Sequence, residues 1–191
     1  MKRFVVLMLV VATSITLSAQ RGGGGFTTLF DGKNLDAFNK VGDANWTIVD
    51  GAVQADKGMG GYLVTKQSYG DFEIKAEFWV DTPANSGIFI RCANPQMPGA
   101  DACYEVNIFD TRPDPTYGTG AIVNVAKVAT PIKAGGKWNT YEIRAQGSHF
   151  VITLNGVKTA EADDAKHARG PFALQYGAGV VKFRSVQVRP L

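Results

Sequence analysis

The amino-acid sequence predicts an all-β protein, a jelly-roll sandwich of two antiparallel sheets. Apolar residues recur at every second position in many short segments, which is the pattern of half-buried strands. Turn-forming glycine, proline and asparagine residues separate these segments, and no stretch of useful length has the 3.6-residue period of a helix. Many short strands joined by tight turns favour a sandwich or a barrel over a fold built from βαβ units.

The predicted strands follow one another through most of the chain. In the first clear one, Phe72, Ile74 and Phe78 share one face. Asn155-Gly156, between two later segments, supplies the two positive-φ residues of a type I′ turn and predicts a hairpin. The nine clearest segments are residues 72–80, 87–93, 104–109, 121–128, 140–145, 150–154, 157–162, 172–176 and 180–189.

Strand alternation also selects the residues of the core. Side chains at every second position of a strand lie on one face, and the apolar face is the one that packs against the second sheet. We therefore expect a core that contains Phe72, Ile74, Phe78, Ile88, Ile90, Val106, Ile108, Ile143, Ile152, Leu154 and Leu174.

The first nineteen residues have the features of a secretory signal peptide. Lys2 and Arg3 precede the apolar run 4–11, and small residues end at Ala19. We divide the chain into this signal peptide (1–19), a flexible linker (20–25) and one domain (26–191). The expected location is periplasmic or secreted, and no later segment is apolar enough to be expected in a membrane.

The charge of the chain argues against nucleic acid as a partner. The formal net charge is +3 and falls to +1 without Lys2 and Arg3, and the remaining basic residues are scattered along the sequence. Proteins that bind nucleic acid instead gather their basic residues in a patch or stripe.

Two cysteines, Cys92 and Cys103, flank the turn-rich segment 93–102. In an oxidising compartment we expect them to form a disulfide, although two unpaired buried thiols are the alternative. A metal centre is less favoured, because neither His149 nor His167 lies at a Cys/His ligand spacing.

Several motifs recur in one order along the chain. They are Gly-Phe-Thr-Thr-Leu-Phe-Asp-Gly-Lys-Asn-Leu at 25–35 and the segments 46–53, 69–73, 85–91, 104–106, 119–122, 138–139, 154–157 and 183–188. In this order they resemble the 3-keto-disaccharide hydrolase family, whose fold is related to that of concanavalin A-like lectins and glucanases. The resemblance covers residues 25–191.

The resemblance implies a concave sugar-binding face and activity on glycosides whose C3 hydroxyl has been oxidised to a ketone. The expected partner is therefore a carbohydrate, an oxidised glycoside. A non-catalytic carbohydrate-binding module is the alternative, and an envelope interaction protein with a vestigial site is a third hypothesis. Fold alone does not decide among them.

Candidate site residues follow from strand parity. If Ile88, Ile90, Val106 and Ile108 face the core, then Arg91, Glu105 and Asn107 project from the opposite face. They would share one surface if their two strands are neighbours. The alternative is an ordinary salt bridge on a solvated sheet face.

The expected chemistry begins at C2 of the 3-keto sugar, where the ketone acidifies the proton. A base removes that proton, and the enolate expels the C1 oxygen by β-elimination, after which water can add. Glu105 is the candidate base and Arg91 the candidate clamp for the enolate oxygen. Asp110 is a candidate second acid/base or metal ligand. Residues 105–110 resemble the Glu-x-Asp-x-x-Glu strand of family 16 glycoside hydrolases, but Asn107 stands at the place of the middle aspartate. Direct hydrolysis of an ordinary glycoside is therefore not expected.

Three further residues are candidates for binding substrate, namely Asn85, Asn107 and Lys127. Lys127 interrupts an apolar run and is either a site cation or a strand-end residue. A divalent cation such as calcium could stabilise an enediolate, but the sequence contains no compact calcium-binding loop, so no metal ligands are assigned.

Overall fold

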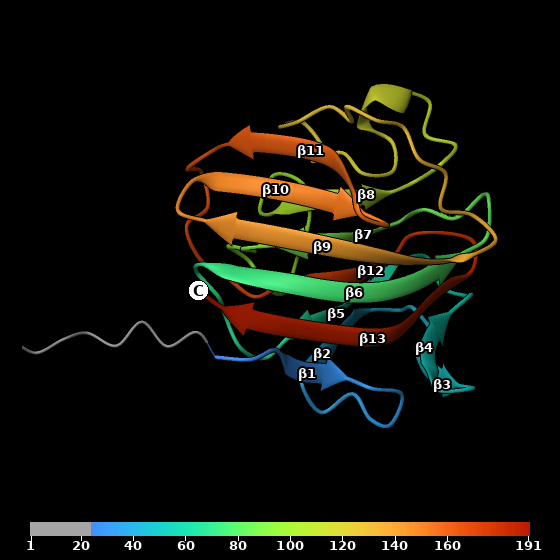
Figure 1. The fold of residues 1–191 in the computed structure, drawn as a ribbon. Coiled ribbons are helices and arrows are strands. Elements are labelled where there is room, and N and C mark those ends of the chain that lie inside the picture. The colour runs from blue at the N-terminus through green and yellow to red at the C-terminus, as the bar shows by residue number, and fades with distance from the viewer. Residues whose placement is uncertain (1–23) are drawn as a thin grey trace, which may run out of the picture.

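The computed structural model describes residues 24–191. The predicted signal peptide, and residues 20–23 of the predicted linker, lie outside this range. The described residues form two antiparallel sheets packed face to face, with the eight-stranded sheet toward the viewer in Figure 1 and the five-stranded sheet behind it. The predicted all-β jelly-roll sandwich is therefore confirmed.

The eight-stranded sheet runs from an edge at β11 to an edge at β3, and β13 pairs with β6 on one side and with both β4 and β1 on the other. In order, its strands are β11 (Val157–Asp163), β10 (His149–Leu154), β9 (Trp138–Gln146), β6 (Phe72–Val80), β13 (Val181–Pro190), β4 (Ala52–Ala55) and β3 (Thr47–Val49), with β1 (Thr27–Phe30) beside β13.

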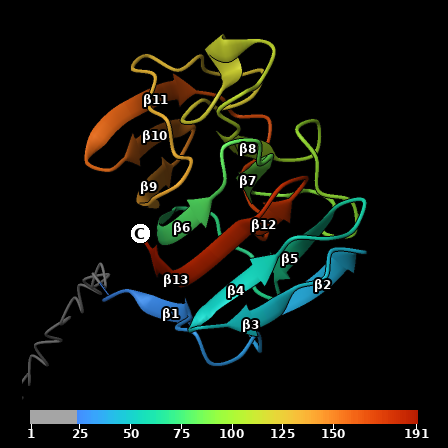
Figure 2. The same ribbon diagram turned by 90° about the vertical axis from the view of Figure 1, so that its right-hand side faces the viewer.

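The five-stranded sheet forms the second layer, which separates from the first in the side view of Figure 2. Its order is β2 (Phe38–Gly42), β5 (Gly61–Thr65), β12 (Ala173–Tyr176), β7 (Ser86–Ile90) and β8 (Tyr104–Ile108). One short 3₁₀ helix, η1 (Pro115–Tyr117), lies in the long connection between β8 and β9.

The core lies between the two sheets and contains every residue predicted for it. All eleven are at most 1% exposed. Alternation along each strand places them on the inner face, and β6 shows the pattern clearly, with buried residues at every second position from Phe72 to Val80.

The Asn155-Gly156 turn is confirmed, with positive φ angles of 52° and 80° between β10 and β11.

The prediction that residues 121–128 form a strand is wrong. Asn124 has a left-handed φ of 62°, which reverses the chain so that the Ile122 and Ala126 amides each donate to the other's carbonyl. This segment instead covers the edge of β8, where the Val123 amide donates to the Glu105 carbonyl.

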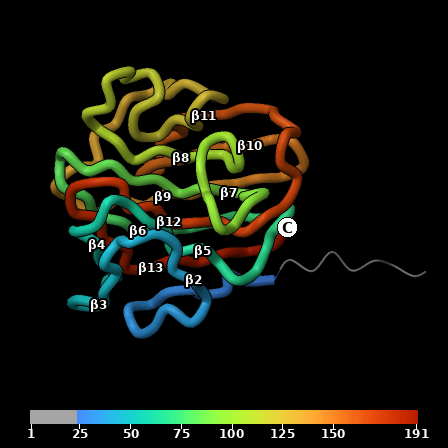
Figure 3. Tube along the Cα trace, turned by 180° about the vertical axis from the view of Figure 1, so that it is seen from behind, coloured from blue at the N-terminus to red at the C-terminus, as the bar shows by residue number. Residues whose placement is uncertain are grey.

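The predicted disulfide between Cys92 and Cys103 is also confirmed. It closes the loop between β7 and β8, which lies over the outer face of the five-stranded sheet and is yellow-green in Figure 3. Beneath this loop the disulfide packs with Val64, Phe89 and Ala173 in a second apolar cluster, separate from the core. The outer face of this sheet is therefore partly buried.

No helix within residues 24–191 is long and apolar enough to cross a membrane.

Candidate active site

The outer face of the five-stranded sheet carries polar residues on three adjacent strands. Gly87 of β7 lies opposite Asn107 of β8, and Phe89 lies opposite Glu105. On the other side of β7, the register of β12 places Gln175 beside Gly87. Glu105, Asn107 and Gln175 therefore surround Gly87, on the face that strand parity predicted for Glu105 and Asn107.

Gly87 leaves a gap between these side chains because it has no Cβ. A Cβ built there would lie 3.5 Å from Gln175 Oε1, 3.5 Å from Glu105 Cγ and 3.1 Å from the Val106 carbonyl oxygen. The Gly87 position thus has the Glu105 side chain on one side and an amide oxygen on the other.

Glu105 is 9% exposed, although it is a charged residue type. Burial raises the pKa of its carboxyl group from the ordinary 4.5 to about 7, and the positive charge of Arg112 opposes this shift. A carboxyl group with a pKa near neutrality can accept and release a proton at physiological pH, as a general base must.

Two amide oxygens on the same face are buried without a hydrogen-bond partner in the described part of the chain, Asn107 Oδ1 and Gln175 Oε1. The rest of Asn107 is firmly held, because its Nδ2 donates to the Tyr117 carbonyl (2.6 Å) and its own carbonyl accepts from Tyr141 Oη (2.6 Å). Buried acceptors nearly always have a donor, so these oxygens are suited to bind the hydroxyl groups of a ligand.

A pocket of about 370 Å³ opens beside Gln175. This volume lies in the range of small-molecule sites. Its walls come from the turn before β5, the loop closed by the disulfide, and the strands beneath, with the lining residues Val41, Gly42, Met59, Gly60, Gly61, Tyr62, Asn85, Gln96, Met97, Pro98, Gln175, Tyr176 and Gly177. Asn85, predicted to bind substrate, therefore lies at this pocket.

Arg91 does not share this face, which corrects the prediction from parity. Arg91 follows the last residue of β7 and has a left-handed φ of 52°, so the alternation of the strand ends before it. Its side chain is 1% exposed, and its guanidinium lies 5.1 Å from the centroid of the core residue Phe150. Arg91 thus points into the space between the sheets.

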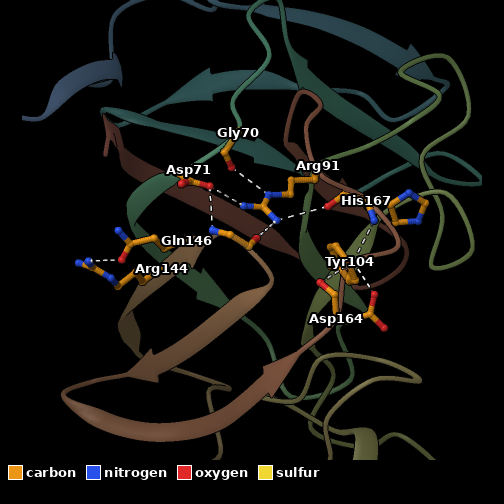
Figure 4. Close-up of polar contacts among 9 residues, drawn as sticks. Gly70, Asp71, Arg91, Tyr104, Arg144, Gln146, Asp164 and His167 are labelled. Carbon is orange, nitrogen blue, oxygen red and sulfur yellow. Dashed lines mark hydrogen bonds and ion pairs between the residues drawn. The ribbon is translucent and has the colours of Figure 1, made fainter. Parts of the chain in front are cut away.

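The Arg91 guanidinium makes four hydrogen bonds there (Figure 4). Its Nε donates to the Gly70 carbonyl (2.9 Å), Nη1 to the carbonyls of Gly147 (2.7 Å) and His167 (3.3 Å), and Nη2 to Asp71 Oδ1 (3.1 Å). These partners belong to three separate loops, so Arg91 joins the loops at one end of the sandwich. It is a structural residue and is not available to bind an enolate beside Glu105.

The Asp110 carboxylate is held by hydrogen bonds in the structure, and its role as a second acid/base or metal ligand stays a prediction. Its carboxylate accepts hydrogen bonds from Thr119 Oγ1 (2.6 Å) and from the amides of Ala134 (2.9 Å) and Gly135 (2.8 Å). Both oxygens are occupied in holding the long β8–β9 connection together. A second acid/base or metal-binding role would require these bonds to break.

Lys127 is exposed on the same connection. Hydrogen bonds from Thr116 lower the pKa of the Asp114 carboxyl, and the charge of Lys127 adds to this shift. Its predicted role in substrate binding stays a prediction.

Arg112, which the sequence analysis did not single out, is the cation whose positive charge acts on the Glu105 carboxyl. It follows a strand in an irregular segment, where no periodicity assigns a direction to its side chain.

Gln175 and Tyr62 were also missed, although a signal for Gln175 exists. It lies at an outward-facing position of the predicted strand 172–176, between two core residues. Tyr62 lies opposite Gln175 on β5 and shares an edge-to-face contact with Phe89, at 5.4 Å between ring centroids. Among residues 24–191, no group of three or more His, Cys, Asp or Glu side chains is arranged to hold a metal ion.

The sandwich and this site place the chain in a class of β-sandwich folds that includes glycosyl hydrolases and carbohydrate-binding modules. A putative glycosyl hydrolase from Parabacteroides distasonis has a TM-score of 0.73 at 26% identity, with 88% of this chain and all of that chain covered. A second one from the same species has a TM-score of 0.78 at 19% identity, covering 92% and 98%. The carbohydrate-binding module CBM66 from Bacillus subtilis has a TM-score of 0.64 at 17% identity, covering 80% and 95%.

The chain belongs to the family described as the 3-keto-alpha-glucoside-1,2-lyase-like domain, which matches residues 25–189. A 3-keto-disaccharide hydrolase from Bacteroides thetaiotaomicron is 34% identical over 77 residues, which cover 34% of this chain and 27% of that protein. The aligned part therefore spans about a quarter of that relative's length. The family resemblance expected from the motifs is confirmed.

Proposed function

We propose that this protein cleaves 3-keto-glycosides by β-elimination, with Glu105 as the general base. The observation that carries the proposal is the buried Glu105 carboxyl, with a pKa of about 7, which lies across Gly87 from the unpaired Gln175 Oε1. The family supplies the substrate class, since its description names a 3-keto-glucoside lyase.

In the first step the Glu105 carboxylate takes the proton from C2, and the electron pair of the C2–H bond moves into the ketone as an enolate. The enolate then reforms the ketone, a C1–C2 double bond forms, and the C1–O bond breaks. The aglycone oxygen leaves with the electron pair and takes up a proton, from Glu105 or from water. Addition of water to the double bond completes a net hydrolysis.

Arg112 replaces Arg91 as the candidate cation for the enolate oxygen in this proposal. Its charge already acts on the Glu105 carboxyl, and a positive charge near a developing enolate lowers the barrier to proton removal. The unpaired amide oxygens Asn107 Oδ1 and Gln175 Oε1 are assigned to sugar hydroxyl groups, together with Asn85 at the pocket. Lys127 is assigned no step.

The confirmed disulfide supports the expected periplasmic or secreted location, because structural disulfides persist mainly in oxidising compartments. Cell fractionation tests this part of the proposal. Recovery of the protein in the cytoplasm with free thiols would contradict it.

The test of function is incubation of the purified protein with 3-keto-glucosides beside their unoxidised parents, with release of the aglycone as the readout. We expect release from the oxidised compounds only.

A carbohydrate-binding module is the second candidate function. The unpaired acceptors favour it, because they can serve binding as well as catalysis. Saturable binding of the 3-keto-glucosides with no release would support that candidate over the enzyme. Adding and chelating calcium in the same assay tests the predicted divalent cation.

A further inference from the structure

The described part of the chain contains two methionines, Met59 and Met97, and both line the pocket beside Gln175. They are the two most exposed large apolar side chains of that part, at 93% and 70%. The other exposed apolar side chains range from 37% to 45%. A single exposed apolar residue is ordinary, but the two largest exposures on one pocket mark a binding surface.

The backbones that carry the two methionines are held in place. Asp43 Oδ1 accepts hydrogen bonds from the amides of Met59 (2.8 Å) and Gly60 (3.1 Å). Met97 lies in the loop closed by the disulfide, and its amide donates to the Asn94 carbonyl (3.3 Å). The two side chains thus extend from fixed positions, while their unbranched thioether chains can adapt to the shape of a ligand.

The rest of this pocket has no charge. None of the residues that line it in the described structure is acidic or basic, and Val41, Tyr62 and Pro98 add further apolar surface. Amides such as Gln96 supply its polar contacts. The pocket therefore suits a neutral and largely apolar group.

Gln175 connects this pocket to Glu105, because its side chain lines the pocket while its Oε1 flanks the Gly87 position opposite Glu105 Cγ. We infer that the aglycone of the substrate binds between Met59 and Met97, and that the protein prefers uncharged aryl or alkyl aglycones. The inference rests on the proposed function, since it takes the sugar ring to lie at Glu105. A well-placed apolar contact distinguishes substrates by about 10- to 200-fold.

The first test compares kcat/KM for phenyl and methyl 3-keto-glucosides. We expect the wild type to favour the phenyl compound by about tenfold or more, and the double variant Met59→Gln/Met97→Gln to lose most of that preference. Ile48→Gln is the matched control, because Ile48 is a 40% exposed apolar residue of the other sheet. An equal preference in the double variant and the wild type would overturn the inference.

A second test does not depend on turnover. The protein is labelled with ¹³C at the methionine methyl groups, in the Glu105→Gln background so that the ligand persists. We expect phenyl 3-keto-glucoside to shift the Met59 and Met97 signals, and the methyl compound to shift them less. If the wild type releases no aglycone but the signals shift, the proposed function fails and the binding site stands. Unshifted signals with active wild-type enzyme would overturn the aglycone site alone.

Discussion

The outer faces of the two sheets satisfy their polar groups in different ways. On the eight-stranded sheet, charged side chains pair with one another: Lys75 with Glu142 at 3.0 Å in solvent, and the less exposed Glu73 with both Arg144 and Arg189. Within the described residues, Arg189 Nε is the buried polar atom of this face that has no partner. On the five-stranded sheet, loops cover the face, and the polar groups beneath them are buried and partly unpaired.

This difference indicates where function lies. Exposed pairs contribute little to stability and are easily replaced, so the charges of the first face need no function to explain them. A buried carboxyl group and two unpaired amide oxygens destabilise the fold, and such a cost is usually retained at a functional site. The predictions below test the contrast, from the largest expected effect to the smallest.

Replacing Glu105 with glutamine should have the largest effect. General-base catalysis contributes about 10² to 10⁴-fold, so release of the aglycone should fall by that factor while the circular-dichroism spectrum is unchanged. In the wild type, kcat/KM should rise with pH through about 7, where the base ionises. Glu142→Gln, an exposed carboxylate of the other sheet, is the control and should be fully active. Near-full activity of Glu105→Gln would show that another group is the base.

Arg91→Met should destabilise the protein without acting on the chemistry directly. Hydrogen bonds to a charged group contribute about 1.5–3 kcal/mol, and the carbonyls of Gly70 and Gly147 would lose theirs to the buried guanidinium. We expect a loss of about 3 kcal/mol in the free energy of unfolding, measured with urea. Arg91→Lys should recover only part of it, because an ammonium group does not reproduce the forked donor. A stable but inactive Arg91→Met protein would instead place Arg91 in catalysis.

The pH dependence of stability should carry the signature of Glu105. Its pKa is about 7 in the folded protein and near its ordinary 4.5 in the unfolded chain, so the folded state favours the protonated form. The stabilisation that follows from this preference is present in full below pH 4.5. It is lost as the pH rises through 7, so the free energy of unfolding falls by about 3 kcal/mol in total. Glu105→Gln should remove that decline, so the variant should be the more stable protein at pH 8. Parallel stability curves for the two proteins would contradict the burial of the carboxyl.

The smallest effect is expected on the eight-stranded sheet. Lys75→Met removes an exposed ion pair with Glu142, and such pairs contribute about 0.2–1 kcal/mol. Stability should change by no more than that, with no change in activity. A loss of activity in this variant would mean that the outer face of the larger sheet also takes part in function.

The sequence predicted the regular part of this site and not the irregular part. Alternation along two strands placed Glu105 and Asn107 on one face, because a strand's side chains alternate wherever its backbone stays extended. It failed at Arg91, where a left-handed residue ends the alternation. No local pattern signals a positive φ at an arginine, and only tertiary contacts hold it there.

The roles of the loop residues could not be predicted from the sequence for a related reason. The partners of Asp110 lie up to 25 residues further along the chain, and the pocket joins the turn at Met59 to the loop at Met97. Such contacts depend on how the sheets bring distant loops together. The sequence contains the residues of the pocket but gives no sign of their proximity.

The most direct test of the central claim is the fate of the hydrogen at C2. A 3-keto-glucoside is cleaved in D₂O, and the sugar product is examined by mass spectrometry and NMR at early times. Elimination through Glu105 predicts a product that either is unsaturated at C2 or carries deuterium there, and the Glu105→Gln variant should form it about 10² to 10⁴-fold more slowly. A product that keeps its original C2 hydrogen would contradict proton abstraction and show that the bond is cleaved in another way.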